Sequence, residues 1–231
     1  DNNVIKGTLP SEIAAMSRVH IFSVTDNSIT GTLPTEVGLM TTLQNLFVDS
    51  NHFTGSLPTE FGQLSALRIL EAYNNRLGGT LPVELANFAD LSSLSLGANA
   101  FTGTLPTEWG EMTAIQELFV HTNQLNGTIP SEISAMRDLI TLAMYTNGLT
   151  GTLPSSIGLM TGLNAFSVKE NMLLGTLPIE LGQLTALTML DVSTNSLTGT
   201  LPTELGQMTV LEILNVTNNM LNGTLPKELG R

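Results

Sequence analysis

One tetrapeptide, Gly-Thr-Leu-Pro or a close variant of it, recurs along this chain at every 24th position. The first copy begins at Gly7 and the last at Gly223, and all ten prolines of the sequence close a copy. No insertion or deletion disturbs the interval. A fixed period in the range of roughly 20–29 residues predicts a solenoid, in which each coil contacts only its two neighbours.

The second recurring feature of the repeat is a segment in which apolar and polar residues alternate. Leu187, Leu190, Val192 and Asn195 show the pattern L-x-x-L-x-V-x-x-N. A period of two predicts a short strand with Leu190 and Val192 inward and Asp191 outward. The asparagine recurs in every unit, and its amide both donates and accepts hydrogen bonds. We therefore expect it to satisfy backbone groups where the chain turns inside the coil.

A short turn is expected after each proline. Proline favours extended geometry in the preceding residue and ends that segment. A Ser/Thr-Glu pair, an apolar residue and often a glycine follow, as in Thr203-Glu204-Leu205-Gly206. This order predicts one helical turn with a polar first residue and a glycine at its end.

The complete unit, L-x-x-L-x-L-x-x-N-x-L-T-G-x-L-P-x-x-L-G-x-L, is similar to the plant-type extracellular leucine-rich repeat. Receptor-kinase ectodomains and polygalacturonase-inhibiting proteins belong to that class. The resemblance implies a right-handed α/β solenoid with a concave parallel β-sheet, a short second sheet on one flank and 3-10 or helical turns on the convex side. It also implies an extracellular or cell-surface location.

The resemblance covers the whole chain, and we expect one leucine-rich-repeat domain over residues 1–231 with about ten coils. Members of the family usually carry cysteine-containing caps at both ends, whereas this sequence has no cysteine. Uncapped end coils expose apolar edges. We therefore expect further repeats, caps or a covering partner beyond both ends.

Composition and charge exclude several functions. Eight basic and twenty acidic residues give a net charge of −12, which disfavours nucleic acid and anionic membrane surfaces as partners. No apolar run reaches the roughly 18 residues of a membrane span, so we expect no membrane insertion of this segment. The absence of cysteine removes disulfides, thiolate metal sites and cysteine nucleophiles.

Catalytic patterns are also missing from the sequence. The three histidines, at positions 20, 52 and 121, occupy different places in the repeat and do not stack into a metal site. The sequence contains no nucleophile–base pairing and no phosphate-binding glycine loop. We therefore expect a non-enzymatic protein with no cofactor and no metal.

The concave strands provide the first candidate binding surface. Since equivalent positions of successive units should form columns, the outward columns of these strands can be read from the sequence, and they vary most. Exposed aromatic residues are candidate anchors, and an excess of acids favours a basic or neutral partner. We expect a protein, peptide or glycan to bind this preformed surface. The predicted contact residues are Phe47, Asp49, Glu71, Tyr73, Phe119, His121, Tyr145, Lys169 and Asp191.

A longer period offers a different explanation of these aromatic residues. Phe47 and Phe119 occupy the same place in units that are three repeats apart, and so do Tyr73 and Tyr145. Duplication of a block of three coils accounts for this spacing without any ligand. Scattered exposed aromatic side chains are also ordinary on protein surfaces. Both interpretations stay open at this point.

A ladder of threonines on the flank is the second candidate surface. The residue between glycine and Leu-Pro is threonine in nine of the ten units, with Ser56 as the exception. The ladder resembles the threonine arrays of solenoid ice-binding proteins, which implies adsorption to ice or another ordered surface such as a mineral or a polysaccharide. The alternative is that threonine is a good strand residue copied by duplication. The candidate residues are Thr32, Thr80, Thr104, Thr128, Thr152, Thr176 and Thr200.

Other patterns have simpler explanations. A column of glutamates, one near the start of nearly every predicted turn, suits the exposed N–H groups there and does not require a bound cation. We assign Trp109 and a methionine-rich column that begins at Met16 to the core. Sequons at Asn126, Asn215 and Asn222 are compatible with glycosylation in the secretory pathway. A purely structural role, as a repeat segment of a larger adhesive or cell-wall protein, is a third functional hypothesis.

Overall fold

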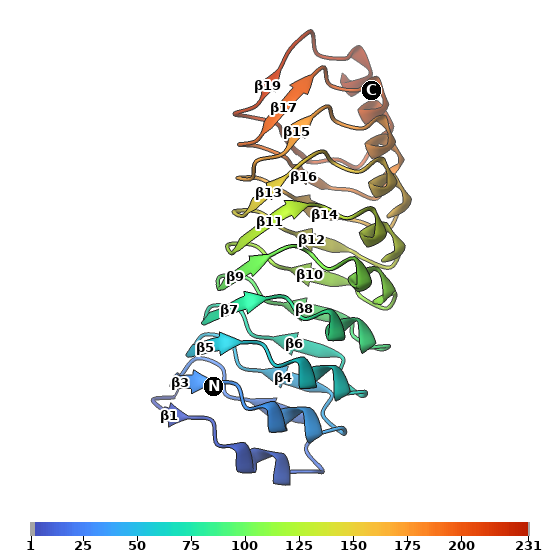
Figure 1. Ribbon diagram of the computed structural model, residues 1–231. Coiled ribbons are helices and arrows are strands. Elements are labelled where there is room, and N and C mark those ends of the chain that lie inside the picture. The colour runs from blue at the N-terminus through green and yellow to red at the C-terminus, as the bar shows by residue number, and fades with distance from the viewer. Residues whose placement is uncertain (1–2, 231) are drawn as a thin grey trace.

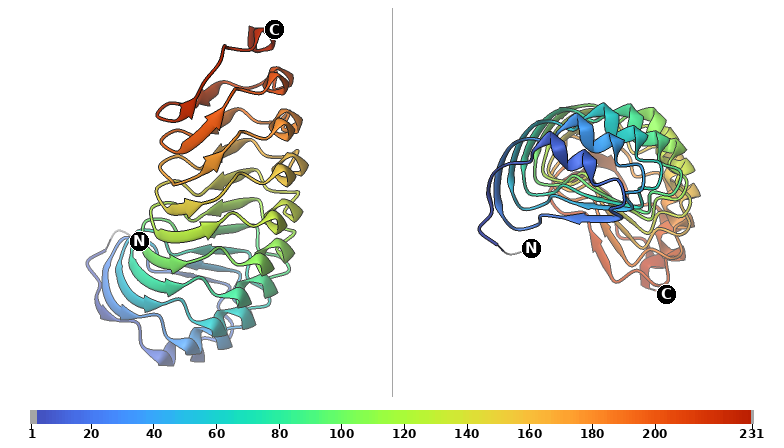
Figure 2. Two further views of the ribbon diagram at one scale, coloured as in Figure 1. Left: turned by 45° about the horizontal axis from the view of Figure 1, so that its top comes forward. Right: turned by 90° about the horizontal axis from the view of Figure 1, so that it is seen from below.

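The computed structural model describes residues 3–230 as a stack of coils, with the two ends of the chain at opposite ends of the stack (Figure 1). Each complete coil has a short strand on the concave side, a second strand on one flank and a 3-10 helix on the remaining side. Viewed from below, successive coils are rotated against one another, so the body twists (Figure 2). The expected α/β leucine-rich-repeat solenoid of parallel strands and short 3-10 turns is confirmed.

The concave sheet consists of nine parallel strands. They pair in register, so that Phe119 lies opposite Ser95 in one neighbouring strand and Ala143 in the other. The middle residue of each strand points into the core, as Leu118 does, and the two residues beside it point outward. The strands are β2 (Ile21–Ser23), β4 (Asn45–Phe47), β6 (Ile69–Glu71), β8 (Ser93–Ser95), β10 (Glu117–Phe119), β12 (Thr141–Ala143), β14 (Ala165–Ser167), β16 (Met189–Asp191) and β18 (Ile213–Asn215).

The flank carries two further parallel sheets, one of seven strands and one of three. They lie at and just before the glycine of the repeat tetrapeptide, and within each sheet every strand pairs with the strand of the next coil. The seven-stranded sheet contains β1 (Lys6–Thr8), β3 (Ser28–Thr32), β5 (His52–Ser56), β7 (Arg76–Thr80), β9 (Ala100–Gly103), β11 (Gln124–Thr128) and β13 (Gly148–Thr150). The three-stranded sheet contains β15 (Leu174–Gly175), β17 (Ser196–Gly199) and β19 (Met220–Leu221). The two sheets are separate because β13 and β15 do not pair.

The convex side is built from 3-10 helices. In η1 to η9 a proline precedes the helix at its N-cap, and no side chain caps the helix by a hydrogen bond. Where a helix begins with threonine or serine followed by glutamate, the hydroxyl instead donates to that glutamate, as Thr107 Oγ1 does to Glu108 Oε2 at 3.2 Å. The helices are η1 (Ser11–Ala15), η2 (Thr35–Leu39), η3 (Thr59–Gln63), η4 (Val83–Asn87), η5 (Thr107–Glu111), η6 (Ser131–Ala135), η7 (Ser155–Leu159), η8 (Ile179–Gln183), η9 (Thr203–Gln207) and η10 (Lys227–Gly230).

The predicted role of the glycine in this turn is wrong. Gly110 lies inside η5 and does not end it. A β-carbon at Gly110 would come within 2.5 Å of the backbone oxygen of Glu132 in the next coil. The glycine is therefore explained by the close approach of two neighbouring turns.

The core is filled by one apolar column after another. Phe101 and Phe166 are fully buried, and Trp109 is only 2% exposed and donates its indole N–H to the backbone oxygen of Pro82 at 3.0 Å. The core assignment of Trp109 is confirmed. Met16 is 45% exposed, because no preceding coil of the described chain covers it, so the core prediction is wrong for that residue.

A ladder of asparagines joins each coil to its neighbours, as predicted. The Nδ2 of Asn123 donates to the backbone oxygens of Leu96, Val120 and His121 at 3.1, 3.2 and 3.1 Å. Its Oδ1 accepts the backbone N–H of Phe101 at 2.9 Å. One amide therefore satisfies backbone groups of its own coil and of the preceding coil.

The residue before each ladder asparagine adopts left-handed backbone geometry. Nine such residues, none of them glycine, have φ between +51° and +54°, including Ala98 and Thr122. The N–H of Thr122 donates to the backbone oxygen of Tyr145 in the next coil at 2.8 Å. Left-handed geometry costs an L-residue roughly 1–2 kcal/mol. This conformation recurs in each coil and directs the side chain of the following asparagine inward.

Candidate binding surfaces

The predicted concave residues lie in two neighbouring columns of the stack. One column consists of the last residues of the concave strands, and the other lies two residues further along each coil. The structure therefore places all of these positions along one face. The first column contains Phe47, Glu71, Phe119 and Asp191, and the second contains Asp49, Tyr73, His121, Tyr145 and Lys169.

An aromatic stack occupies the middle of this face. The rings of His121 and Tyr145 lie 4.3 Å apart between centroids and only 9° from parallel. Phe119 meets His121 edge-on, with 6.5 Å between their centroids. The His121 ring covers Gly97, where a β-carbon would lie 2.6 Å from Nε2. Because Gly97 has no side chain, His121 can lean into the preceding coil.

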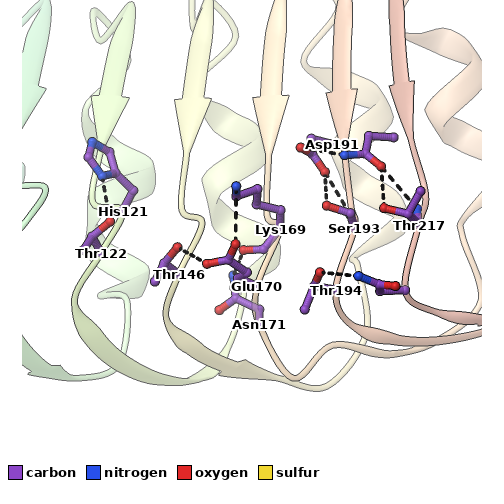
Figure 3. Close-up of polar contacts among 12 residues, drawn as sticks. His121, Thr122, Thr146, Lys169, Glu170, Asn171, Asp191, Ser193, Thr194 and Thr217 are labelled. Atoms are coloured by element: carbon purple, nitrogen blue, oxygen red, sulfur yellow. Dashed lines mark hydrogen bonds and ion pairs between the residues drawn. The ribbon is translucent and has the colours of Figure 1, made fainter.

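The side chain of Lys169 lies at the C-terminal side of this stack. The Nζ of Lys169 lies 5.9 Å from the centroid of the Tyr145 ring. The same Nζ lies 3.3 Å from Oε1 of Glu170 (Figure 3). Thr146 donates a hydrogen bond of 2.8 Å to Oε2 of the same carboxylate. The hydrogen bonds from Thr146 and Lys169, together with the lysine charge, hold the pKa of Glu170 below its usual value. Lys169 is thus already partnered.

Asp191 is also engaged within the protein. Its Oδ1 accepts hydrogen bonds from the N–H and the hydroxyl of Ser193 at 3.0 and 2.6 Å, and its Oδ2 accepts one from Asn215 at 3.2 Å (Figure 3). Asn215 in turn accepts a 2.8 Å hydrogen bond from the Thr217 hydroxyl. The carboxylate of Asp191 and the amide of the Asn215 sequon therefore stabilise the C-terminal part of the concave face.

Asp49 requires a correction, because its side chain is fully buried and is not part of the contact surface. Thr25 of the preceding coil donates a 2.8 Å hydrogen bond to Oδ1. Oδ2 has no hydrogen-bond partner among the described residues. Partial burial raises the pKa of Tyr73, and the negative charge of Asp49 raises it further. Asp49 thus contributes charge from within the wall of the concave face.

A cavity of about 330 Å³ opens on the N-terminal side of the aromatic stack. We call it the concave pocket. Ser93 donates a 3.0 Å hydrogen bond to Oε2 of Glu117 in its wall. Burial lowers the pKa of His121, because it disfavours the charged imidazolium. The residues that line the concave pocket are Glu71, Tyr73, Ser93, Ser95, Glu117, Phe119 and His121.

The carboxyl group of Glu71 in the concave pocket has a raised pKa. Partial burial raises its pKa most, and the charges of Asp49 and Glu117 raise it further. The folded state therefore holds this proton more tightly than the unfolded chain does. Stability from this group is present at low pH and is lost as the pH rises through the folded pKa.

The raised pKa of Glu71 leads to a measurable prediction for the variant Glu71→Gln. We expect the variant to be slightly more stable than the wild type at pH 7, by less than about 1 kcal/mol because the group is partly solvated. The gain should vanish near pH 3.5, below the ordinary glutamate pKa of about 4.3, where the carboxyl is protonated in both states. Thermal melting at both pH values measures this. The control is Glu108→Gln, which removes the same charge on the convex side; an equal gain there would contradict the local explanation.

The threonine ladder is exposed along the flank, and its side chains are held in place. Each γ-methyl group packs on a glycine of the next coil: a β-carbon at Gly127 would lie 2.7 Å from Cγ2 of Thr104. The threonine that precedes the glycine of the repeat makes a hydrogen bond instead. Thr102, for example, donates a hydrogen bond from its hydroxyl to the backbone oxygen of Gly79 at 3.3 Å. Within residues 3–230, the ladder hydroxyls have no hydrogen-bond partner in the protein. The exposed ladder includes the predicted residues Thr32, Thr80, Thr104, Thr128, Thr152, Thr176 and Thr200.

Three further features of the described residues bear on function. The residues at 3–230 contain no group of three or more His, Asp or Glu side chains that could hold a metal ion. In the same range no helix has the length and apolar character needed to cross a membrane. The sequons at Asn126 and Asn222 are exposed, whereas the Asn215 side chain is partly buried.

The repeat and the whole fold match known proteins. The family model for the Leucine Rich Repeat matches residues 42–64, 186–208 and 210–231. The plant peptide hormone receptor RGFR1, solved in complex with RGF2, superposes with a TM-score of 0.97 and 33% identity over 98% of this chain. The Arabidopsis receptor kinase HAESA, solved with the peptide hormone IDA and the co-receptor SERK1, superposes with a TM-score of 0.96 and 30% identity over 99%.

The chain covers only part of these receptors, 36% of the first and 38% of the second. A plant ice-binding protein is also similar, with a TM-score of 0.83 and 25% identity over 97% of this chain and 74% of that protein. No protein of curated function matches the sequence. The repeat motif, the stacked parallel strands and these matches together show that the chain is built from leucine-rich repeats of the plant receptor type.

Proposed function

We propose that this chain is a non-enzymatic, extracellular or cell-surface binding module that holds a peptide or protein ligand on its concave face. The observation that carries the proposal is the aromatic stack of Phe119, His121 and Tyr145 beside an open pocket on one continuous face. The similar receptors RGFR1 and HAESA were solved with peptide hormones.

The physical basis of this function is a preformed surface. The side chains of the stack restrict one another, and the strands beneath them are fixed by the ladder of backbone and asparagine hydrogen bonds. Binding to such a surface orders few protein groups, so little conformational entropy is lost. Partly exposed aromatic rings supply the large apolar contacts that dominate many interfaces. A glycan ligand would use the same rings.

Truncation of the aromatic stack tests this proposal. The probe is a peptide selected against the intact chain from a random display library, with its affinity measured by calorimetry. We expect Tyr145→Ala to weaken binding by at least tenfold, since anchor residues typically contribute about 2 kcal/mol or more, roughly 30-fold. The control is Ile179→Ala, which truncates an exposed side chain on the convex side. Selected peptides whose affinity is unchanged by both Tyr145→Ala and His121→Ala would reject the concave face.

The threonine ladder supports a second candidate function, adsorption to ice or another ordered surface. Its hydroxyls have no protein partner within residues 3–230, and the contact of each methyl group with the next glycine fixes the side-chain orientation. The similarity to a plant ice-binding protein extends over 97% of the chain. The ladder would present hydroxyl and methyl groups at the spacing of neighbouring strands, about 4.8 Å.

Bulky side chains on the flank test this second candidate. In the triple variant Thr104→Tyr, Thr128→Tyr and Thr152→Tyr, we expect thermal hysteresis and uptake into growing ice to disappear, because the tyrosines interrupt the ladder. The control is Thr107→Tyr, an exposed position on the convex side. Wild-type protein without thermal hysteresis and without uptake would eliminate ice as the surface.

A further inference from the structure

The concave pocket lies on the N-terminal side of His121, and its lining includes both Tyr73 and His121. Tyr73 and His121 are separated by one coil, and that coil contributes only Gly97 to their column. The His121 ring covers Gly97 and stacks on Tyr145 on its other side. The pocket volume of about 330 Å³ is at the lower end of the range typical of ligand sites. The site is therefore open, bounded by rings and large enough for a ligand side chain.

The charge of the concave pocket is negative and unpaired. Its lining includes two carboxylates, Glu71 and Glu117, and no lysine or arginine. Among residues 3–230, the one ion pair joins Lys169 to Glu170, so neither pocket carboxylate has a cationic partner. The hydrogen bond from Ser93 to Glu117 comes from a neutral donor. The protein itself therefore leaves this charge uncompensated.

A third carboxylate, that of Asp49, adds negative charge from within the wall of the concave face. Asp49 is fully buried, and its Oδ2 has no hydrogen-bond partner among the described residues. Its charge acts on both Glu71 and Tyr73, two residues of the pocket lining, and raises the pKa of each. A buried carboxylate that has no cationic partner is costly. A cation in the concave pocket would lower this cost.

The aromatic walls favour one kind of cation. Lys169 already lies over the Tyr145 ring at 5.9 Å, so the C-terminal end of the stack has a cation of its own. The N-terminal end, formed by Phe119 and His121, faces the two glutamates instead. A guanidinium group is planar and weakly hydrated, stacks on aromatic rings and binds a carboxylate through two parallel N–H groups. It fits this combination of groups better than an ammonium does.

We propose that the concave pocket binds an arginine side chain of the ligand, with its guanidinium between Glu71 and Glu117 and against the rings of Phe119 and His121. The inference rests on the proposed function, because it assumes a peptide or protein on the concave face. It goes further by assigning the chemistry of one ligand residue and its place on the solenoid.

Two capped tripeptides test the inference on the intact chain. The probes are Gly-Arg-Gly and Gly-citrulline-Gly, which differ in the charge of the side chain and have almost the same shape. We expect the arginine probe to shift the NMR resonances of the His121 ring and to bind at least tenfold more tightly than the citrulline probe. Equal affinity of the two probes, or no shift at His121, would overturn the inference.

Charge variants provide the matched control. We expect Glu117→Gln and Glu71→Gln each to weaken binding of the arginine probe at least fivefold, while Glu108→Gln on the convex side changes it less than twofold. All three remove one negative charge, so the comparison separates a local contact from the overall acidity of the protein. An equal effect of Glu108→Gln and Glu117→Gln would also overturn the inference. Circular dichroism of each variant confirms that it is folded.

The outcomes for the pocket and for the proposed function are distinguishable. If the arginine probe fails while the selected peptide still loses affinity in Tyr145→Ala, the arginine assignment is wrong and the concave binding face stands. If the arginine probe behaves as expected while selected peptides ignore Tyr145→Ala and His121→Ala, the proposed function is wrong and the pocket is a cation site without that role.

Discussion

Asn123→Ala is expected to lower the free energy of unfolding by about 2–4 kcal/mol, because one backbone N–H loses its acceptor and further hydrogen bonds between coils are removed. The N–H of Phe101 loses its acceptor. The backbone oxygens of Leu96 and Val120 each lose one of two donors and keep the amides of Asn99 and Asn147, respectively. Each buried polar group left unsatisfied costs roughly 1–3 kcal/mol. Urea denaturation followed by circular dichroism measures the loss.

The control for this variant lies in the same coil. Asn126 is exposed in β11, and its side chain has no hydrogen-bond partner within residues 3–230. Asn126→Ala should therefore change stability by no more than about 0.5 kcal/mol. Similar losses in Asn123→Ala and Asn126→Ala would mean that the asparagine ladder does not hold the coils together.

The second large effect is expected for Gly127→Ala, at about 2–5 kcal/mol, the sum of a backbone cost and a packing cost. Gly127 has φ of +73°, where an L-residue costs roughly 1–2 kcal/mol. The added β-carbon would also lie 2.7 Å from Cγ2 of Thr104, and overpacking of this kind typically costs about 1–3 kcal/mol. The same denaturation experiment measures the two costs together.

The chain contains a matched comparison that separates the two costs. Gly79 has the same backbone geometry, with φ of +76°, but it faces Ser56, which lacks the methyl group. A β-carbon there would lie 3.3 Å from the nearest atom, Cβ of Ser56. Gly79→Ala should therefore be milder than Gly127→Ala by about 1 kcal/mol. Adding Thr104→Ser to Gly127→Ala should recover a similar amount, and no recovery would show that the methyl contact is unimportant.

The repeat allowed the fold to be predicted because its constant length determines which residues become neighbours. The inward Leu118, the buried Trp109 and the hydrogen-bonded Asn123 all follow from position in the unit. Column position also gave the face on which Phe119 and Tyr145 lie. These properties depend on backbone geometry alone, and that geometry repeats from coil to coil.

The details of the candidate site depend on side chains that do not repeat. Asp49 is buried because Thr25 and its other neighbours cover it, and column position alone does not show this. His121 leans over the preceding coil because Gly97 leaves room for it. Gly97 was the available signal, as a residue without a side chain in an otherwise filled column. The unpaired charge of the pocket became visible only when the positions of Glu71 and Glu117 were known.

The contact between each ladder threonine and the next glycine has a consequence for how this protein could change in length. The packing contact of Thr104 with Gly127 recurs one coil later between Thr128 and Gly151. Each asparagine amide likewise links its coil to the preceding coil by hydrogen bonds. A complete repeat unit that is inserted or removed would make the same contacts with its new neighbours. Duplication of whole units can therefore lengthen the concave face by one coil at a time and change the distance between Glu71 and Tyr145. The length of ligand that the face accommodates and the spacing of its contacts can thus evolve while the packing of the core is preserved.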